Sequence, residues 1–250
     1  MKYRFLLGEL VKKGIKLKYR RSYLGIIWSL LEPLFEMAVL TIVFGTLFGN
    51  SDKTFPVYIL TGRLLYSFFS QGTKASLKSI RSNSAMIKKV YVPKYLYPMS
   101  SVLFNYVIFL ISLIVLVLVS LILGVYPTRY VLLAAVPLIL ILVLTYGVGM
   151  ILATLGVFFR DMEYLWNVAL MLVMYMCAIF YYPQRLLDSG YFWILKWNPL
   201  YCIIAVFRDT VFGRAPDIQM LLYATAFSFG SLIVGLFVFR RHQDEFILHI

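Results

Sequence analysis

The carboxylates with the best spacing for metal chemistry lie in one short segment, RDMEY at 160–164. Asp161 and Glu163 form a DxE pair, and carboxylate oxygens are ligands that Mg²⁺ prefers. Phosphoryl or glycosyl transfer would need a second acidic cluster on the same side, and the sequence offers none. We therefore expect Arg160, Asp161 and Glu163 to form a structural ion pair or a docking contact at a cytoplasmic turn. A membrane glycosyl- or phosphotransferase that uses Asp161 and Glu163 is the alternative.

The other candidate chemistries lack their signatures. The segment GTLFGNSDK at 45–53 is rich in glycine but lacks the Gly-Lys-Ser/Thr end that holds nucleotide phosphates. His242 and His249 have no further ligands at metal-site spacing, which favours a disordered tail. Cys177 and Cys202 show no CxxC spacing, so we expect both to be unpaired. The sequence predicts no catalytic residue, bound cofactor or metal in this chain, and no ATP hydrolysis by it.

The composition requires a membrane. Hydrophobic residues make up 62% of the 250 residues and charged residues only 14%, whereas charged residues are about a quarter of a soluble protein. We expect an all-α integral membrane protein with six transmembrane helices, an N-terminal interfacial helix, and short outer re-entrant helices between spans five and six. The prediction is a single domain over 1–250, divided into the interfacial helix, the membrane domain and a cytoplasmic tail at 1–32, 33–239 and 240–250.

Apolar runs locate the elements that would position any site. The six predicted spans cover 33–48, 55–72, 99–123, 130–157, 165–181 and 218–239. Arg63 interrupts the second span, and we expect its long side chain to reach the outer interface, with a functional role as the alternative. The segment 183–217 is too apolar for a loop and too interrupted for a span. It predicts two short helices, at 194–197 and 200–207, that dip into the outer leaflet.

The distribution of basic residues sets the orientation. Seventeen of the 24 Lys and Arg residues fall in 1–32, 73–98, 160 and 240–241. Because basic residues concentrate on the cytoplasmic side, these segments and both termini are predicted to be cytoplasmic. The basic residues that give the net charge of +13 border the apolar runs, which favours membrane lipids over nucleic acid as their partner.

Two polar or aromatic clusters are candidates for binding. The loop 73–98 carries six basic residues and no acid, which suits anionic lipid, a pyrophosphate-linked substrate or an acidic groove on a soluble partner. The outer side is rich in aromatic residues, which suit either an interfacial belt or a platform for sugar rings. These aromatic candidates are Tyr181, Tyr182, Tyr191, Phe192, Trp193, Trp197 and Tyr201.

Four segments together resemble a known family. They are KYRRSYLGIIWSLLEPLFEMAVLTIVFGTLFG at 18–49, KKVYVPKYLYP at 88–98, GVFFRDMEYLW at 156–166 and NPLYCIIAVFRDTVFG at 198–213. The chain resembles the ABC-2 exporter permeases, in the branch that exports O-antigen polysaccharide and teichoic acid. The resemblance covers nearly the whole chain. Arg63 has no clear counterpart in it.

The resemblance implies a transport subunit that moves a lipid-linked polysaccharide from the cytoplasmic leaflet across the bacterial inner membrane. It implies a homodimer of permeases joined to two copies of a soluble ATPase, which binds the ATP and Mg²⁺. The residues expected to dock on the ATPase are Ser84, Ile87, Lys88, Lys89, Tyr91, Pro93, Lys94 and Tyr95. We assign the lipid pyrophosphate to Arg20 and Arg21, because fixed cations suit that headgroup.

Two alternatives share the membrane-transport class. An exporter of a drug or small lipid with the same fold would tolerate truncation of the outer aromatic residues. A secondary transporter is disfavoured because the predicted spans lack deep acidic residues, on which proton or sodium coupling usually depends.

Overall fold

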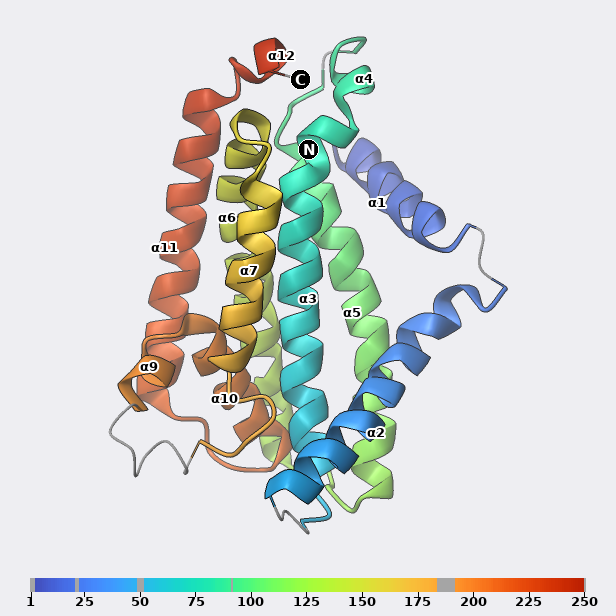
Figure 1. Cartoon of the computed structure of the whole chain (residues 1–250), viewed down its shortest axis with the longest axis vertical. Helices are drawn as coiled ribbons and strands as arrows, with labels where there is room; N and C mark the ends of the chain where they lie inside the picture. Colours follow the sequence, from blue (N-terminus) through green and yellow to red (C-terminus); the bar gives the residue numbers. More distant parts are fainter. Residues whose placement is uncertain (1–2, 21–22, 49–51, 91, 184–191, 250) are drawn as a thin grey trace.

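The computed structural model describes residues 3–20, 23–48, 52–90, 92–183 and 192–249, and every regular element among them is a helix. Four long helices run side by side along the long axis of the molecule (Figure 1). They are α3 (Phe55–Ser82), α5 (Leu96–Ile122), α6 (Ala135–Phe158) and α11 (Ile218–His242). The shorter α7 (Met162–Tyr175) lies along them, α2 (Trp28–Phe48) leans away, and α1 (Arg4–Tyr19) crosses obliquely near one end.

Helix α3 is the centre of the bundle. Eighteen of its 28 residues are buried, and many of these are small or hydroxylated, such as Thr61, Gly62 and Ser76. At about 1.5 Å per residue the helix is about 42 Å long. It continues through 73–82, which the sequence analysis had placed in a loop. This stretch forms a helix because it is amphipathic: Leu77 and Ile80 are buried in the core, while its lysines face outward.

The peripheral helices present apolar side chains outward, as lipid-facing helices do. On α2, Phe35, Val39 and Ile42 are 60%, 59% and 67% exposed. Among the described residues, four segments are long and apolar enough to cross a bilayer: Gly25–Leu47, Leu96–Ile122, Arg129–Phe158 and Ile218–His242. The expected all-α, multi-pass membrane architecture is thus confirmed. Helix α3 is more polar than these segments, and α7, with 14 residues, spans about 21 Å of a hydrocarbon core of about 30 Å.

Glycines allow α6 and α11 to pack at very short range. A Cβ added to Gly147 would lie 2.5 Å from the backbone nitrogen of Leu232, and one added to Gly235 would collide with the carbonyl oxygen of Gly147. Small residues at such crossings let helix backbones approach each other in membranes. This pair fixes the position of α11 against the core.

The short elements gather at the two ends of the bundle (Figure 1). One end carries α1, α4 (Ser84–Ile87) and α12 (Phe246–His249), and the other carries α9 (Phe192–Lys196) and α10 (Pro199–Val211). Two 3-10 turns, η1 (Gly25–Ile27) and η2 (Arg129–Ala134), precede α2 and α6. Helix α1 and helix α12 therefore lie at the same end of the bundle.

The expectation of a disordered C-terminal tail was wrong for the described residues. Helix α11 continues through His242, and α12 follows after a turn. Phe246 is fully buried and packs edge-on against Phe239 and Phe158, with ring centroids 5.2 and 6.0 Å apart. The His249 ring packs edge-on against Phe158 as well, at 4.9 Å. A buried aromatic anchor outweighs the polar composition of this tail.

Candidate functional site

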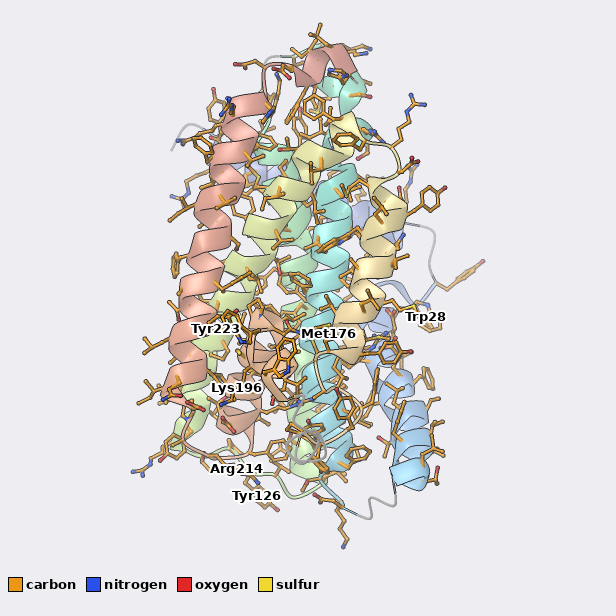
Figure 2. The ribbon with its side chains drawn as sticks, turned by 60° about the vertical axis from the view of Figure 1, so that its left-hand side comes forward. Trp28, Tyr126, Met176, Lys196, Arg214 and Tyr223 are labelled. Atoms are coloured by element: carbon orange, nitrogen blue, oxygen red, sulfur yellow. The ribbon has the colours of Figure 1, made fainter. Side chains whose placement is uncertain are left out.

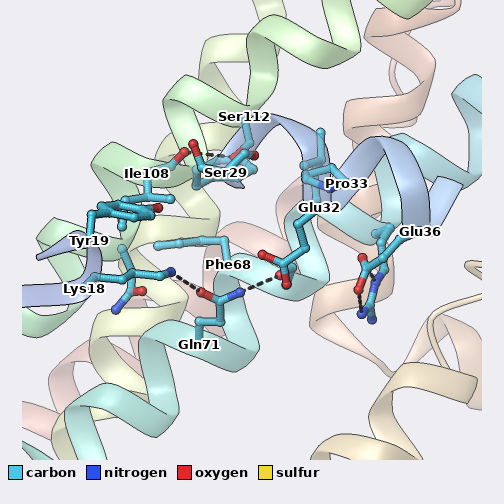
Figure 3. A pocket seen from close by; sticks show the side chains of 15 residues that line it. Lys18, Tyr19, Ser29, Glu32, Pro33, Glu36, Phe68, Gln71, Ile108 and Ser112 are labelled. Atoms are coloured by element: carbon cyan, nitrogen blue, oxygen red, sulfur yellow. Dashed lines mark hydrogen bonds and ion pairs between the residues drawn. The ribbon is translucent and has the colours of Figure 1, made fainter. Parts of the chain in front are cut away.

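A charged pocket lies between α2, α3 and α5, close to the end of α1 (Figure 3). Glu36 on α2 and Arg63 on α3 form a bidentate ion pair, with Arg63 Nε donating to Oε2 at 2.7 Å and Nη2 donating to Oε1 at 2.6 Å. Arg63 Nη1 also donates to Met174 Sδ of α7 at 3.7 Å. Two parallel charge-assisted bonds are the strong geometry for this pair. Arg63 therefore links three helices and does not reach for the outer interface.

Two acidic residues of α2 account for this difference. Glu36 already falls within the predicted first span at 33–48, and because α2 begins at Trp28 the helix includes Glu32 as well. Both carboxylates lie in a segment that is long and apolar enough to cross a bilayer, contrary to the expectation that the spans lack deep acidic residues. Glu36 is the partner that keeps Arg63 within the bundle.

The pocket itself is small and polar. It encloses about 40 Å³ and is lined by Glu32 and Glu36, with Gln71 at its wall. Lys18 Nζ on α1 donates to Gln71 Oε1 at 3.0 Å, and Gln71 Nε2 donates to Ser67 Oγ at 3.0 Å (Figure 3). Ser112 Oγ donates to the Ser29 carbonyl at 2.9 Å and ties α5 to α2. An exposed bond therefore joins α1 to α3, while the buried bond between Ser112 and Ser29 satisfies the polar groups where α5 meets α2.

The acidic turn between α6 and α7 does not form the expected internal ion pair. Glu163 instead pairs with Lys78 of α3, and both side chains are largely exposed. Arg160 and Asp161 are exposed at the turn that precedes α7. Within the described part of the chain, no three His, Cys, Asp or Glu residues lie together as metal ligands would. The turn therefore contributes a surface contact between α7 and α3.

The outer aromatic residues divide into two groups. The Tyr182 ring is tilted against the Tyr58 ring, with centroids 4.6 Å apart, and its hydroxyl donates to Asp52 Oδ2 at 3.2 Å, while Tyr201 is buried in α10. These four residues line a cavity of about 730 Å³ at the end that carries α10. The cavity also holds charged side chains of both signs: Arg208, Asp209, Arg214 and Asp217. Aromatic faces combined with fixed charges are suited to polar ring-containing ligands.

The other aromatic residues point elsewhere. Trp193 and Trp197 are 59% and 71% exposed on α9 and the turn after it. The Tyr223 hydroxyl donates to the Trp197 carbonyl at 2.8 Å, and both Tyr223 and the neighbouring Lys196 lie on this side of the bundle (Figure 2). The Tyr181 hydroxyl donates to a carbonyl of its own segment, that of Tyr175, at 2.9 Å. Tyr191 lies outside the described residues, as does the side chain of Phe192.

The NPLY…FRD segment, whose role the sequence did not reveal, anchors the turn after α7. Asn198 caps α10 through its side-chain oxygen and donates its amide to the Met176 carbonyl at 3.1 Å. Arg208, 6% exposed, donates to the carbonyls of Ala178 at 3.1 Å and Tyr58 at 3.2 Å, and its guanidinium lies 3.5 Å from the Tyr58 ring centroid. A Cβ at Gly62 would lie 2.5 Å from this guanidinium. The arginine is thus held by carbonyl groups and an aromatic face.

The predicted docking loop lies at the end that carries α4. Ser84 and Ile87 begin and end α4, and Ile87 belongs to the same apolar cluster as Phe246. Lys88 and Lys89 are exposed, while Lys94 Nζ donates to the Gln243 carbonyl at 2.5 Å. Pro93 and Tyr95 line a groove of about 770 Å³ between this loop and the C-terminal end of α11. Tyr91 lies outside the described residues. The loop and the C-terminal tail therefore form one continuous surface.

The pyrophosphate candidates are described only in part. Arg20 is exposed immediately after the end of α1, and Arg21 lies outside the described residues. Arg20 does not line the charged pocket of Figure 3, whereas the adjacent Tyr19 and Lys18 do. Lys18, which the sequence did not mark as a candidate, lines this pocket at the end of α1 instead of Arg20.

Comparisons with known proteins agree with this architecture. The model of the family described as ABC-2 type transporter matches residues 6–212. An O-antigen export system permease protein, RfbA, of Klebsiella pneumoniae is 29% identical over 96% of this chain and 93% of its own length. The RfbA permease of Myxococcus xanthus is 28% identical over 98% and 95%, and the polysialic acid transport protein KpsM of Escherichia coli is 25% identical over 94% and 92%. The family match covers most of the helical bundle described above, and the chain belongs to the ABC-2 type transporter family.

Proposed function

We propose that this chain is the permease subunit of an ATP-driven exporter that moves a lipid-linked polysaccharide of the O-antigen type out of the cytoplasmic leaflet. The observation that carries the proposal is its similarity, over nearly the full length of both chains, to O-antigen export permeases from two bacteria. The multi-pass helical bundle supports it. The resemblance to teichoic acid exporters points to the same class of substrate, a polymer linked to a lipid.

In this proposal the chain crosses the bacterial inner membrane six times, with α3 and α7 supplying two crossings beside the four apolar segments. Helices α9 and α10 are the outer re-entrant helices, and the three parts at 1–32, 33–239 and 240–250 make one domain. The end that carries α4 faces the cytoplasm, because Lys88, Lys89, Arg240 and Arg241 are exposed there.

Two copies of this permease bind two copies of a soluble ATPase, which supplies the ATP and Mg²⁺ chemistry. Helix α4 and the loop that follows it form the docking surface. Support comes from the exposed cations Lys88 and Lys89 beside the exposed Val90, an arrangement that fits an acidic groove with an apolar floor. Packing of Ile87 and Phe246 in one cluster gives this surface a rigid base.

The first test is a pull-down from membranes that contain the tagged permease, with the bound proteins identified by mass. We expect the wild-type chain and a Lys53→Ala control to recover a nucleotide-binding subunit, and a Lys88→Ala/Lys89→Ala variant to recover much less. Lys53 is also exposed, but it precedes α3 and therefore lies at the opposite end of that helix from α4. Recovery of no ATPase by the wild-type chain under mild extraction would overturn the proposal.

The second test addresses the size of the substrate. We expect a Trp193→Ala/Trp197→Ala variant to fold normally, because both side chains are exposed, and to reduce surface polysaccharide severalfold if these rings guide a glycan. ATPase recovery in the pull-down should not change. Undiminished export by this variant would favour an exporter of small lipids or drugs.

A further inference from the structure

A groove beneath the interfacial helix gathers lysines from two helices that are far apart in the sequence. It measures about 680 Å³ and lies between α1, α3 and α5. Lys13 and Lys18 come from α1, while Lys74 and Lys78 come from α3. None of the described residues that line the groove carries a carboxylate. Such a concentration of like charge is unfavourable unless solvent or a bound anion compensates it.

The lysines of the groove differ in their surroundings. Lys78 is paired with Glu163 of α7. Within the described part of the chain, Lys13, Lys18 and Lys74 have no carboxylate at ion-pair distance. Lys18 donates to the amide oxygen of Gln71, lies 5.9 Å from the ring centroid of Tyr19 and interacts electrostatically with the more distant Glu32. The ammonium groups of Lys13 and Lys74 therefore remain available to an anion that enters the groove, with Lys18 beside them.

The remaining lining suits an amphiphilic ligand. Hydroxyl and amide side chains of Ser82, Asn83, Ser100, Ser101 and Asn105 provide hydrogen-bonding groups around the lysines. Leu10, Leu17 and Phe104 form an apolar wall, and α1 contacts α5 so closely that a Cβ at Gly14 would lie 2.8 Å from the Phe104 ring. The groove thus combines a polar, cationic part with an apolar part, as a lipid headgroup and the start of its chain require.

The position of the groove agrees with this chemistry. Helix α1 carries lysines among apolar residues and lies obliquely across the bundle near the end that we place in the cytoplasm (Figure 1). Amphipathic helices of this kind lie at headgroup depth, where lipid phosphates are found. Lysines near the membrane surface attract anionic headgroups, each by a modest amount that adds up over several residues.

We propose that this groove, which we call the lysine groove, is a binding site for the phosphate or diphosphate headgroup of a membrane lipid. Lys13, Lys18 and Lys74 contact the phosphate oxygens, and Ser101 and Asn105 lie beside them. Arg20, one of the two arginines assigned to the pyrophosphate from the sequence, does not line this groove. In the setting of the proposed export function, the groove holds the diphosphate that links a polysaccharide to its lipid carrier before transport.

The test uses the purified full-length chain in detergent and measures lipid binding by native mass spectrometry. The two probes are a polyprenyl diphosphate and phosphatidylglycerol, each compared with neutral phosphatidylcholine. A Lys13→Gln/Lys74→Gln variant removes two charges from the groove. The matched control, Lys12→Gln/Lys16→Gln, removes two charges from exposed positions of α1 outside the groove. Intact size-exclusion profiles establish that both variants fold.

We expect the groove variant to bind its lipid roughly 30-fold more weakly than the control does, from about 1 kcal/mol for each of the two lysines. Loss confined to the polyprenyl diphosphate identifies the lipid carrier as the ligand, and loss confined to phosphatidylglycerol identifies a bilayer lipid. Equal affinities of the groove variant and the control for both probes would overturn the proposal. The readout needs neither ATPase nor glycan, so a failed pull-down would refute the export function and leave the lysine groove standing.

Discussion

Substitutions of the Glu36–Arg63 pair should show how much this pair contributes to the free energy of unfolding. The pair holds α2 against α3 through bonds of 2.7 and 2.6 Å, and its side chains are 31% and 23% exposed. Removing one partner of a fully buried pair costs about 3–5 kcal/mol, and an exposed pair is worth at most about 1 kcal/mol. For this partly buried pair we expect each single substitution, Glu36→Leu or Arg63→Leu, to cost about 2–3 kcal/mol.

Each single variant leaves the remaining charged side chain without its partner, a cost that the double variant avoids. The double variant should lose less than the sum of the singles, by about 1–3 kcal/mol.

The assay is thermal unfolding of the detergent-solubilised chain, followed by the fraction that remains monodisperse. A loss of 2–3 kcal/mol corresponds to a fall of roughly 5–10 °C in the apparent midpoint. Glu163→Leu, which breaks the exposed pair with Lys78, is the control and should shift the midpoint little. Strict additivity of the two single substitutions, or single substitutions as mild as the control, would refute the view that this pair is a structural link.

Three other substitutions test the packing described here. Gly235→Ala should destabilise the chain by about 1–3 kcal/mol, because the new methyl group would collide with the α6 backbone, whereas Gly230→Ala on the same helix meets open space and should be neutral or stabilising in the same thermal assay. Asn198→Ala should cost about 1–2 kcal/mol through loss of the α10 cap, and Asn198→Asp should recover part of it by restoring the capping oxygen; equal melting of both variants would contradict this. Phe246→Ala should release the C-terminal tail, seen as faster proteolysis after residue 242, whereas Leu248→Ala, 82% exposed, should digest like the wild type.

The sequence was sufficient for the class of protein. Low charge and long apolar runs predicted a helical multi-pass membrane protein, because backbone groups in lipid must be paired within the helix. The family followed from segments such as those around Pro33 and Asn198, and the ABC-2 match confirmed it. The same-end location of α1 and α12 agrees with the count of basic residues. The predicted helices at 194–197 and 200–207 correspond to α9 and α10 with shifted ends.

Contacts between helices came only from the tertiary structure. In the sequence, Arg63 is a single cation within a predicted span, and its partner Glu36 lies near the start of another predicted span. Their pairing depends on how α2 packs against α3. Arg208 was part of a recognised segment, but its carbonyl partners lie 30 and 150 residues away. The lysine groove unites Lys13 and Lys74 from different helices. Apolar helices in lipid carry no polar stripe that marks their inner face, so one-dimensional patterns reveal where a helix lies and not which neighbour it touches.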